Sequence, residues 1–211
     1  MFTLLWFWCL LSCAAVVALT VVVLRFLLRS RTLYDHGIPH LLQVDDDVFR
    51  SGQPPAKTPS AWRYLQSKGI TDVLKFNFAH EGVDDPPEDC GITVHDLAVQ
   101  PEGDMDVLDD VKDTIVKPDW GKFAEGIAIL QAVKASGGKR KALIHCTHGN
   151  DRTGIFVGIA RVLIWGWTKI AAWREMVARG FHPELLGLMT TWLEFKAPTA
   201  STDAQASKPS Q

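Results

Sequence analysis

The densest group of reactive side chains lies at residues 145–154, which have the sequence HCTHGNDRTG. Cys146 offers a sulfur nucleophile, and Arg152 offers a planar guanidinium that matches two oxygens of a phosphate group. The backbone amides between them can point inward as an anion-binding nest. A helix that begins near Arg152 adds unpaired N–H groups and the positive end of its dipole. This pattern predicts a site that holds a phosphoryl group against a sulfur.

The same positive field favours the thiolate form of Cys146. A thiolate that faces a bound phosphoryl group can attack phosphorus, form a cysteinyl-phosphate and then release phosphate to water. We expect Thr153 to donate a hydrogen bond to the sulfur, Gly149 to let the backbone approach the anion, and His145 to hold the loop. The predicted phosphate-binding residues are Thr147, His148, Gly149, Asn150, Asp151, Arg152 and Thr153.

Strands that alternate with helices predict an α/β domain with a largely parallel central sheet. The expected strands cover residues 48–50, 71–74, 92–99 and 142–145, and the expected helices cover residues 61–68, 118–135, 152–165, 169–179 and 183–195. Ser60 is expected to cap the first helix, and Gly69 to end it. Residues 79–91 and 100–117 are acidic and predicted to be irregular. Ligands of such sheets bind beyond the carboxyl ends of the strands, where residues 145–154 fall.

The order His-Cys, five residues, Arg-Thr-Gly resembles the signature of the cysteine-dependent protein tyrosine phosphatase superfamily. RSGQP at residues 50–54, GITDV at 69–73 and GWT at 166–168 also resemble bacterial dual-specificity-type phosphatases. The resemblance covers residues 48–195. It implies a central sheet of four or five mostly parallel strands flanked by helices, a phosphatase activity, and no metal or other cofactor.

The resemblance also implies a general acid, an aspartate on a loop that protonates the leaving oxygen. That aspartate is expected between the strand at residues 92–99 and the helix near residue 119, where the chain is rich in acidic residues. Counting forward from the strand favours Asp104, whereas counting back from the helix favours Asp113. Asp119 is an alternative that can also cap the helix. We select Asp104, with Cys146 and Arg152, as the predicted catalytic residues.

Charge narrows the expected substrate. The formal net charge of −2 argues against a nucleic-acid partner. Residues 81–119 contain 13 acidic residues and two lysines, which disfavours polyanionic substrates, as does Asp151 inside the loop. We therefore expect phosphotyrosine, and secondarily phosphoserine or phosphothreonine, on proteins. The alternative is a phosphoinositide or other small phosphomonoester, since an Asp-Arg-Thr ending also occurs in some phosphoinositide phosphatases.

Two other classes of protein remain as hypotheses. A phosphate-binding pseudophosphatase is disfavoured because Cys146 and Arg152 are both present. A sulfurtransferase or arsenate reductase also uses a cysteine in an anion loop, but without the Arg-Thr-Gly ending. A zinc site at Cys146 and the neighbouring histidines is disfavoured, because a second pair of ligands is missing from the sequence.

The first 31 residues predict a membrane anchor. Residues 2–24 are uncharged, and about 20 apolar residues suffice to span the hydrocarbon layer as a helix. Arg25, Arg29 and Arg31 follow the span, which places the catalytic domain on the cytoplasmic side, with a periplasmic or extracytoplasmic location as the alternative. The expected domains are an anchor with a basic segment at 1–31, a phosphatase domain at 32–196 and a disordered tail at 197–211.

Overall fold

The computed structural model describes residues 34–101 and 119–196. A five-stranded sheet has the order β3-β4-β7-β5-β6, and β1 (Tyr34–Asp35) pairs with β2 (Ile38–Pro39) in a separate hairpin. The five strands are β3 (Leu42–Asp45), β4 (Val48–Ser51), β5 (Ile70–Lys75), β6 (Thr93–Asp96) and β7 (Lys141–His145). Only β3 runs antiparallel to its neighbour within this sheet. The predicted mostly parallel sheet is confirmed, with five strands.

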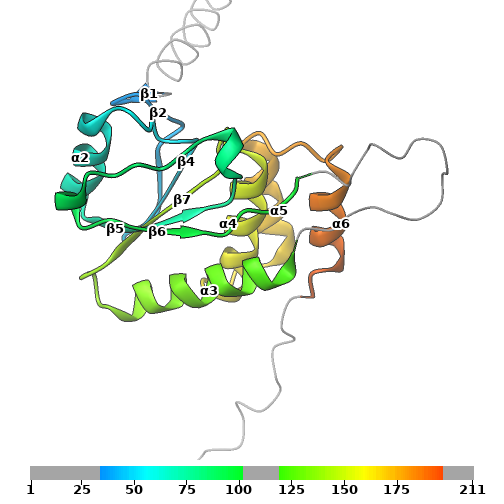
Figure 1. Cartoon of the computed structure of the whole chain (residues 1–211). Helices are drawn as coiled ribbons and strands as arrows, with labels where there is room; N and C mark the ends of the chain where they lie inside the picture. The colour runs from blue at the N-terminus through cyan, green and yellow to red at the C-terminus, as the bar shows by residue number, and fades with distance from the viewer. Residues whose placement is uncertain (1–33, 102–118, 197–211) are drawn as a thin grey trace, which may run out of the picture.

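Helices cover both faces of this sheet (Figure 1). They are α2 (Pro59–Ser67), α3 (Trp120–Ala135), α4 (Asp151–Leu163), α5 (Lys169–Ala178) and α6 (Leu186–Glu194), with the short 3-10 helices η1 (Ala79–Glu81) and η2 (Glu88–Cys90). Side chains of a strand point alternately to its two faces. Leu143 accordingly packs in the core beneath α2, whereas Ala142 and Ile144 pack in the core beneath α3 to α6. Burial on both faces explains why the middle of β7, residues 142–144, is apolar.

Helix α4 is the central helix of the larger core. Its residues 152–162 are all buried, and it packs against β7, α5 and α6. Phe156 on α4 forms ring contacts with Phe76, which follows β5, and with Phe123 on α3. The helix that begins inside the signature is therefore fixed by aromatic and aliphatic contacts along its whole length.

Some predicted boundaries were wrong. Helix α2 begins at Pro59 after Thr58, because proline suits the first turn of a helix, so Ser60 is not its cap. Helix α3 begins at Trp120, and the Asp119 carboxylate accepts a hydrogen bond from Gly121 N at 2.8 Å. Helix α6 begins at Leu186 rather than at residue 183.

Several predictions concern residues 1–33, 102–118 and 197–211, which lie outside the described residues. They include the membrane anchor and the terminal tail, so the expected division into domains stays a prediction. Within the described parts of the chain, no helix is long and apolar enough to cross a bilayer.

Candidate active site

The signature loop, residues 146–152, joins the carboxyl end of β7 to the first turn of α4. Cys146 is only 3% exposed, and its sulfur accepts a hydrogen bond from Gly149 N at 3.3 Å. Gly149 has φ +80°, and a Cβ there would lie 2.5 Å from Ser51 O. Only glycine combines this backbone conformation with such close packing, and the approach of this backbone to an anion stays a prediction.

Arg152 lies in the first turn of α4 with its guanidinium directed into the loop. Its Nη2 donates to Thr147 Oγ1 at 2.8 Å. Its Nη1 and Nη2 also donate to the two carboxylate oxygens of Glu81, at 2.6 and 2.5 Å. Burial lowers the pKa of Arg152, but the hydrogen bonds to Glu81 and the nearby Cys146 sulfur outweigh that effect and raise it above its usual value. The structure thus brings the predicted nucleophile and its arginine together.

Glu81, the last residue of η1, is the main partner of that arginine. Partial burial opposes ionisation of Glu81, but hydrogen bonds from Arg152 and from Phe78 N lower the pKa to about 2. Thr147 Oγ1 donates a further hydrogen bond to this carboxylate at 3.1 Å. Glu81 therefore stays ionised near neutral pH, which makes it a partner for Arg152 rather than a proton donor.

A second arginine supports the loop from below. Arg50 on β4 is 4% exposed and donates from Nη2 to Gly149 O at 2.7 Å. Burial lowers the pKa of Arg50 to about 10, and the nearby Cys146 opposes that change. β4 reaches the loop because Arg50 and Ile144 are paired in the parallel register of β4 and β7. Two cations therefore lie near the same sulfur.

His145 directly precedes the nucleophile and is completely buried. Its Nε2 lies 2.7 Å from Asp84 Oδ2, and Gln53 Nε2 donates to the other oxygen of that carboxylate. The backbone N of Gln53 also donates to Thr147 O at 3.0 Å. The contacts agree with the expected role of His145 in holding the loop.

The other predicted phosphate-binding residues occupy the rim and the floor of the loop. His148 is exposed and Asn150 is half-buried. Asp151 accepts hydrogen bonds from His182 N and from its ring Nδ1, at 2.8 and 2.9 Å. Thr153 is completely buried, and its hydroxyl has no hydrogen-bond partner among the residues described. That hydroxyl is not hydrogen-bonded to the Cys146 sulfur here, and it has a hydrogen bond to give.

The general acid is not located. Asp104 and Asp113 lie outside the described residues, and the choice of Asp104 stays a prediction. Asp119 does act as the helix cap that the sequence predicted. Over residues 34–101 and 119–196, no group of three or more His, Cys, Asp or Glu side chains could hold a metal ion.

Sequence analysis missed four residues of this site: Arg50, Gln53, Glu81 and Asp84. The first two belong to the RSGQP segment at residues 50–54, which carried a family resemblance but no assigned role. The two acids lie within residues 79–91, and nothing in that stretch separates them from the surrounding acidic residues. Only the folded chain shows which carboxylates turn inward.

The arrangement can bind an oxyanion and attack it. The buried Cys146 sulfur, the Arg152 guanidinium, the Gly149 N–H and the first turn of α4 converge at the carboxyl edge of the sheet. These groups stabilise negative charge on a thiolate and on the equatorial oxygens of a phosphoryl group. Such a site suits transfer of a phosphoryl group to sulfur.

Known proteins resemble this chain in sequence. Two curated relatives, both named dual specificity protein phosphatase TpbA and from two Pseudomonas aeruginosa strains, are 27% and 29% identical over 145 and 146 residues. Each match covers 69% of this chain but 56% of the relative. The chain therefore spans little more than half the length of these curated relatives.

Solved structures show the same fold. The crystal structure of P. aeruginosa TpbA matches with a TM-score of 0.50 and 23% identity, over 74% of this chain and 85% of that one. Tk-PTP in its active form matches with a TM-score of 0.53 and 18% identity, over 73% and 96%. PTPMT1 in complex with PI(5)P matches with a TM-score of 0.52 and 16% identity, over 72% and 93%.

A family model described as the tyrosine phosphatase family matches residues 44–164. That span begins in β3, includes the whole of the signature loop, and ends just beyond α4. It covers more than half of the chain, and it contains each of the described residues that converge on Cys146. The chain belongs to the tyrosine phosphatase family.

Proposed function

We propose that this protein is a phosphoric monoester hydrolase that works through a cysteinyl-phosphate on Cys146. The observation that carries the proposal is the meeting of one sulfur with the Gly149 N–H and the Arg152 guanidinium. Both donors stabilise negative charge, first on the thiolate and then on the phosphoryl oxygens that replace it as the acceptor. The names of the curated relatives support the same activity.

The reaction has two steps. The Cys146 thiolate attacks phosphorus, the P–O bond to the leaving group breaks, and Asp104 protonates the departing oxygen. Water then attacks phosphorus, the S–P bond breaks, and inorganic phosphate leaves with the thiolate restored. Arg152 and the loop amides hold the three equatorial oxygens in both steps, and the free Thr153 hydroxyl donates to the sulfur as it departs.

The proposed substrates are phosphotyrosine and, secondarily, phosphoserine or phosphothreonine on proteins. The dual-specificity name of the relatives favours this class. A phosphoinositide is the second candidate, because the Asp151 carboxylate is engaged by His182. Asp151 then repels a phosphorylated headgroup less than a free carboxylate would.

Hydrolysis of p-nitrophenyl phosphate tests the activity. The wild-type protein should release p-nitrophenol, and Cys146→Ser should abolish the release, because a hydroxyl stays protonated where a thiol ionises. Binding of phosphate without turnover by the wild type would instead indicate a pseudophosphatase. Thiosulfate or arsenate turnover without phosphatase activity would indicate another cysteine enzyme.

Substrate class needs a separate comparison. Phosphotyrosyl, phosphoseryl and phosphothreonyl peptides should be assayed beside phosphoinositides in mixed vesicles at equal phosphate concentration. A higher kcat/KM for the phosphotyrosyl peptide supports the first proposal, whereas a preference for vesicles supports the second. The pull-down of substrates with Cys146→Ser then identifies phosphorylated proteins that remain bound.

We also propose that residues 2–24 anchor the protein in a membrane as one helix, with the catalytic domain in the cytoplasm. The uncharged length of this segment and the three arginines that follow it support the proposal. The full chain should pellet with membranes, and a chain that begins at residue 32 should not. External protease should leave the domain intact in sealed cells, and its digestion would place the domain on the other side.

A further inference from the structure

Asp84 is a buried carboxylate that contacts His145, the residue directly before the proposed nucleophile Cys146. Its side chain is 1% exposed, and the His145 side chain that it contacts is 0% exposed. A carboxylate removed from water in this way is strongly destabilising unless hydrogen bonds replace its hydration. The fold supplies two of them, one to each oxygen, from His145 Nε2 at 2.7 Å and from Gln53 Nε2.

These contacts belong to a short chain of hydrogen-bonded groups, of which Asn77 is buried and Gln53 half-buried. Asn77 Nδ2 donates to Gln53 Oε1 at 2.8 Å, and Gln53 in turn donates to Asp84. Asn77 follows β5, Gln53 follows β4, and His145 ends β7. The carboxylate of Asp84 thereby connects the carboxyl ends of three neighbouring strands, directly below the signature loop.

The histidine ring depends on this carboxylate for its orientation. A carboxylate accepts hydrogen bonds and does not donate them, so the proton lies on His145 Nε2. In the part of the chain that the structure describes, His145 Nδ1 has no hydrogen-bond partner. Asp84 is thus the ring's one polar contact among these residues. The backbone of His145 is fixed as well, since its carbonyl accepts from Phe76 N at 2.9 Å.

We propose that Asp84 is a positioning residue that fixes the sulfur of Cys146 through His145. The inference rests on the proposed phosphatase activity. Asp84 fixes the orientation of the His145 ring and thereby the backbone at the end of β7, which leads directly into Cys146. Loss of the Asp84 carboxylate would then displace the sulfur relative to Arg152, although no group that touches the substrate is removed. A misplacement of about 1 Å can cost a factor of about 100 in rate.

Asp84→Asn is the sharpest variant, because it keeps the shape of the side chain. His145 Nε2 and Gln53 Nε2 now meet two different oxygens, and in an amide one of those two positions is an NH₂ group that donates and does not accept. The matched control is Asp72→Asn on β5. Asp72 is also a buried carboxylate, 4% exposed, that contacts a histidine, His95, at 3.0 Å and uses both of its oxygens. It lies near the start of its strand, away from the signature loop.

Three measurements separate positioning from mere stability. The first is kcat and KM with p-nitrophenyl phosphate, the second is the rate of Cys146 alkylation by iodoacetamide, followed on the Cys146 peptide, and the third is thermal unfolding. Asp84→Asn should lower kcat about 10- to 100-fold with KM changed less than about threefold, and it should slow the alkylation. Asp72→Asn should lower the melting temperature and leave kcat and alkylation unchanged.

A double-mutant cycle with His145→Asn completes the test. If Asp84 acts through the ring, Asp84→Asn should have little further effect on kcat once His145 is Asn. Equal effects in both backgrounds would overturn the proposal, as would a normal kcat in Asp84→Asn or a variant that no longer folds. Phosphatase activity of the wild type, and its absence in Cys146→Ser, is established first. A negative result for Asp84 would then contradict only its positioning role and not the proposed phosphatase activity.

Discussion

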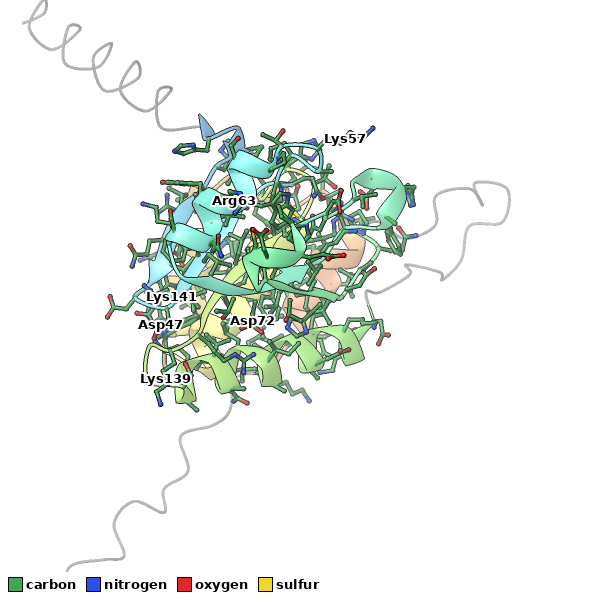
Figure 2. The ribbon with its side chains drawn as sticks, turned by 60° about the vertical axis from the view of Figure 1, so that its left-hand side comes forward. Asp47, Lys57, Arg63, Asp72, Lys139 and Lys141 are labelled. Atoms are coloured by element: carbon green, nitrogen blue, oxygen red, sulfur yellow. The ribbon has the colours of Figure 1, made fainter. Side chains whose placement is uncertain are left out.

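The two ends of the parallel strands both bury charged groups, but they use them differently. At the amino end, Asp72 accepts from Arg140, His95 and Thr71, and those hydrogen bonds lower its pKa although burial opposes them. Figure 2 shows Asp72 with Asp47, Lys139 and Lys141 in the lower half of the molecule, around the starts of the strands.

At the carboxyl end, the charges converge on a single sulfur and leave some atoms unpaired. Four buried side-chain atoms lack a hydrogen-bond partner among the described residues, and three of them belong to Asn77, His145 and Thr153. All three lie in or beside the signature loop. Buried polar groups usually have a hydrogen-bond partner, so these three side chains are the ones at this end of the sheet with a hydrogen-bonding position left to offer.

The largest effect should come from Arg152→Lys. Lysine keeps a positive charge opposite Glu81, so the fold should survive, but a point charge cannot reproduce the planar pair of donors. The value of kcat/KM with p-nitrophenyl phosphate should fall about 100- to 1000-fold. Arg140→Lys at the amino end should leave it unchanged. Equal turnover by Arg152→Lys and the wild type would contradict the idea that only the charged groups at the carboxyl end of the strands serve catalysis.

Glu81→Gln should have the next largest effect. A glutamine offers one acceptor oxygen where Arg152 Nη1 and Nη2 now use two, so the guanidinium gains freedom. We expect kcat/KM to fall about 10- to 100-fold, with Asp72→Asn again as the control. A rise in activity would mean that Glu81 blocks the phosphate site instead of orienting the arginine.

Two glycines with left-handed backbones sharpen the comparison. Gly149→Ala combines φ +80° with a Cβ placed 2.5 Å from Ser51 O, whereas Gly138 has φ +83° and nothing nearer than Asp47 Oδ1 at 3.8 Å. Gly138→Ala should cost roughly 1–2 kcal/mol of unfolding free energy from backbone strain alone. Gly149→Ala should cost more and should also lower activity, which Gly138→Ala should leave unchanged. Urea denaturation measures the unfolding free energy of each variant. Similar losses of unfolding free energy in Gly138→Ala and Gly149→Ala would show that the loop can move to make room for the added Cβ.

The smallest effect concerns stability in acid. Glu81 lies at the carboxyl end of the strands and Asp45 at the amino end, and burial alone would raise the pKa of both carboxyl groups. Hydrogen bonds from Arg152 nevertheless lower the pKa of Glu81 to about 2, and hydrogen bonds from Lys134 and Trp165 lower the pKa of Asp45 to about 2. Their folded-state pKa lies below the unfolded value. Their contribution is therefore present above about pH 4.5 and is lost as the pH falls toward about 2.

Melting temperatures measured between pH 2 and 6 test this linkage. Glu81→Gln and Asp45→Asn should each flatten the acid limb of the curve, because the folded state no longer holds that carboxylate ionised. Only Glu81→Gln should change turnover at neutral pH. An acid limb that keeps its wild-type slope in both variants would contradict the two lowered pKa values.

The elements that could be predicted are those whose signal is local. The sequence places β7 and α4 within one residue of their observed starts, because an apolar strand, a polar loop and an apolar helix follow one another at residues 141–163. Cys146, Gly149 and Arg152 were predicted together for the same reason. Their geometry is set within seven residues of chain.

What sequence reasoning missed depends on contacts between distant residues. Arg152 and Glu81 are 71 positions apart, and His145 and Asp84 are 61 apart. Strand β3 was not predicted because the run is short and all four of its residues are at least partly exposed, although LQVD does alternate between apolar and polar side chains. Arg161 on α4 is likewise only 8% exposed, because Glu175 pairs with it and the centre of the Trp167 ring lies 4.2 Å from its guanidinium.

The burial of α4 has a consequence for how the protein meets its ligand. The signature loop ends at Arg152 in the first turn of α4, and residues 152–162 of this helix are all buried. The loop therefore cannot change conformation without breaking the packing of α4 around Phe156. Amide exchange in residues 152–162 should then be as slow as global unfolding allows. An oxyanion such as vanadate would then bind to a preformed site, and its binding would raise the melting temperature of the whole domain.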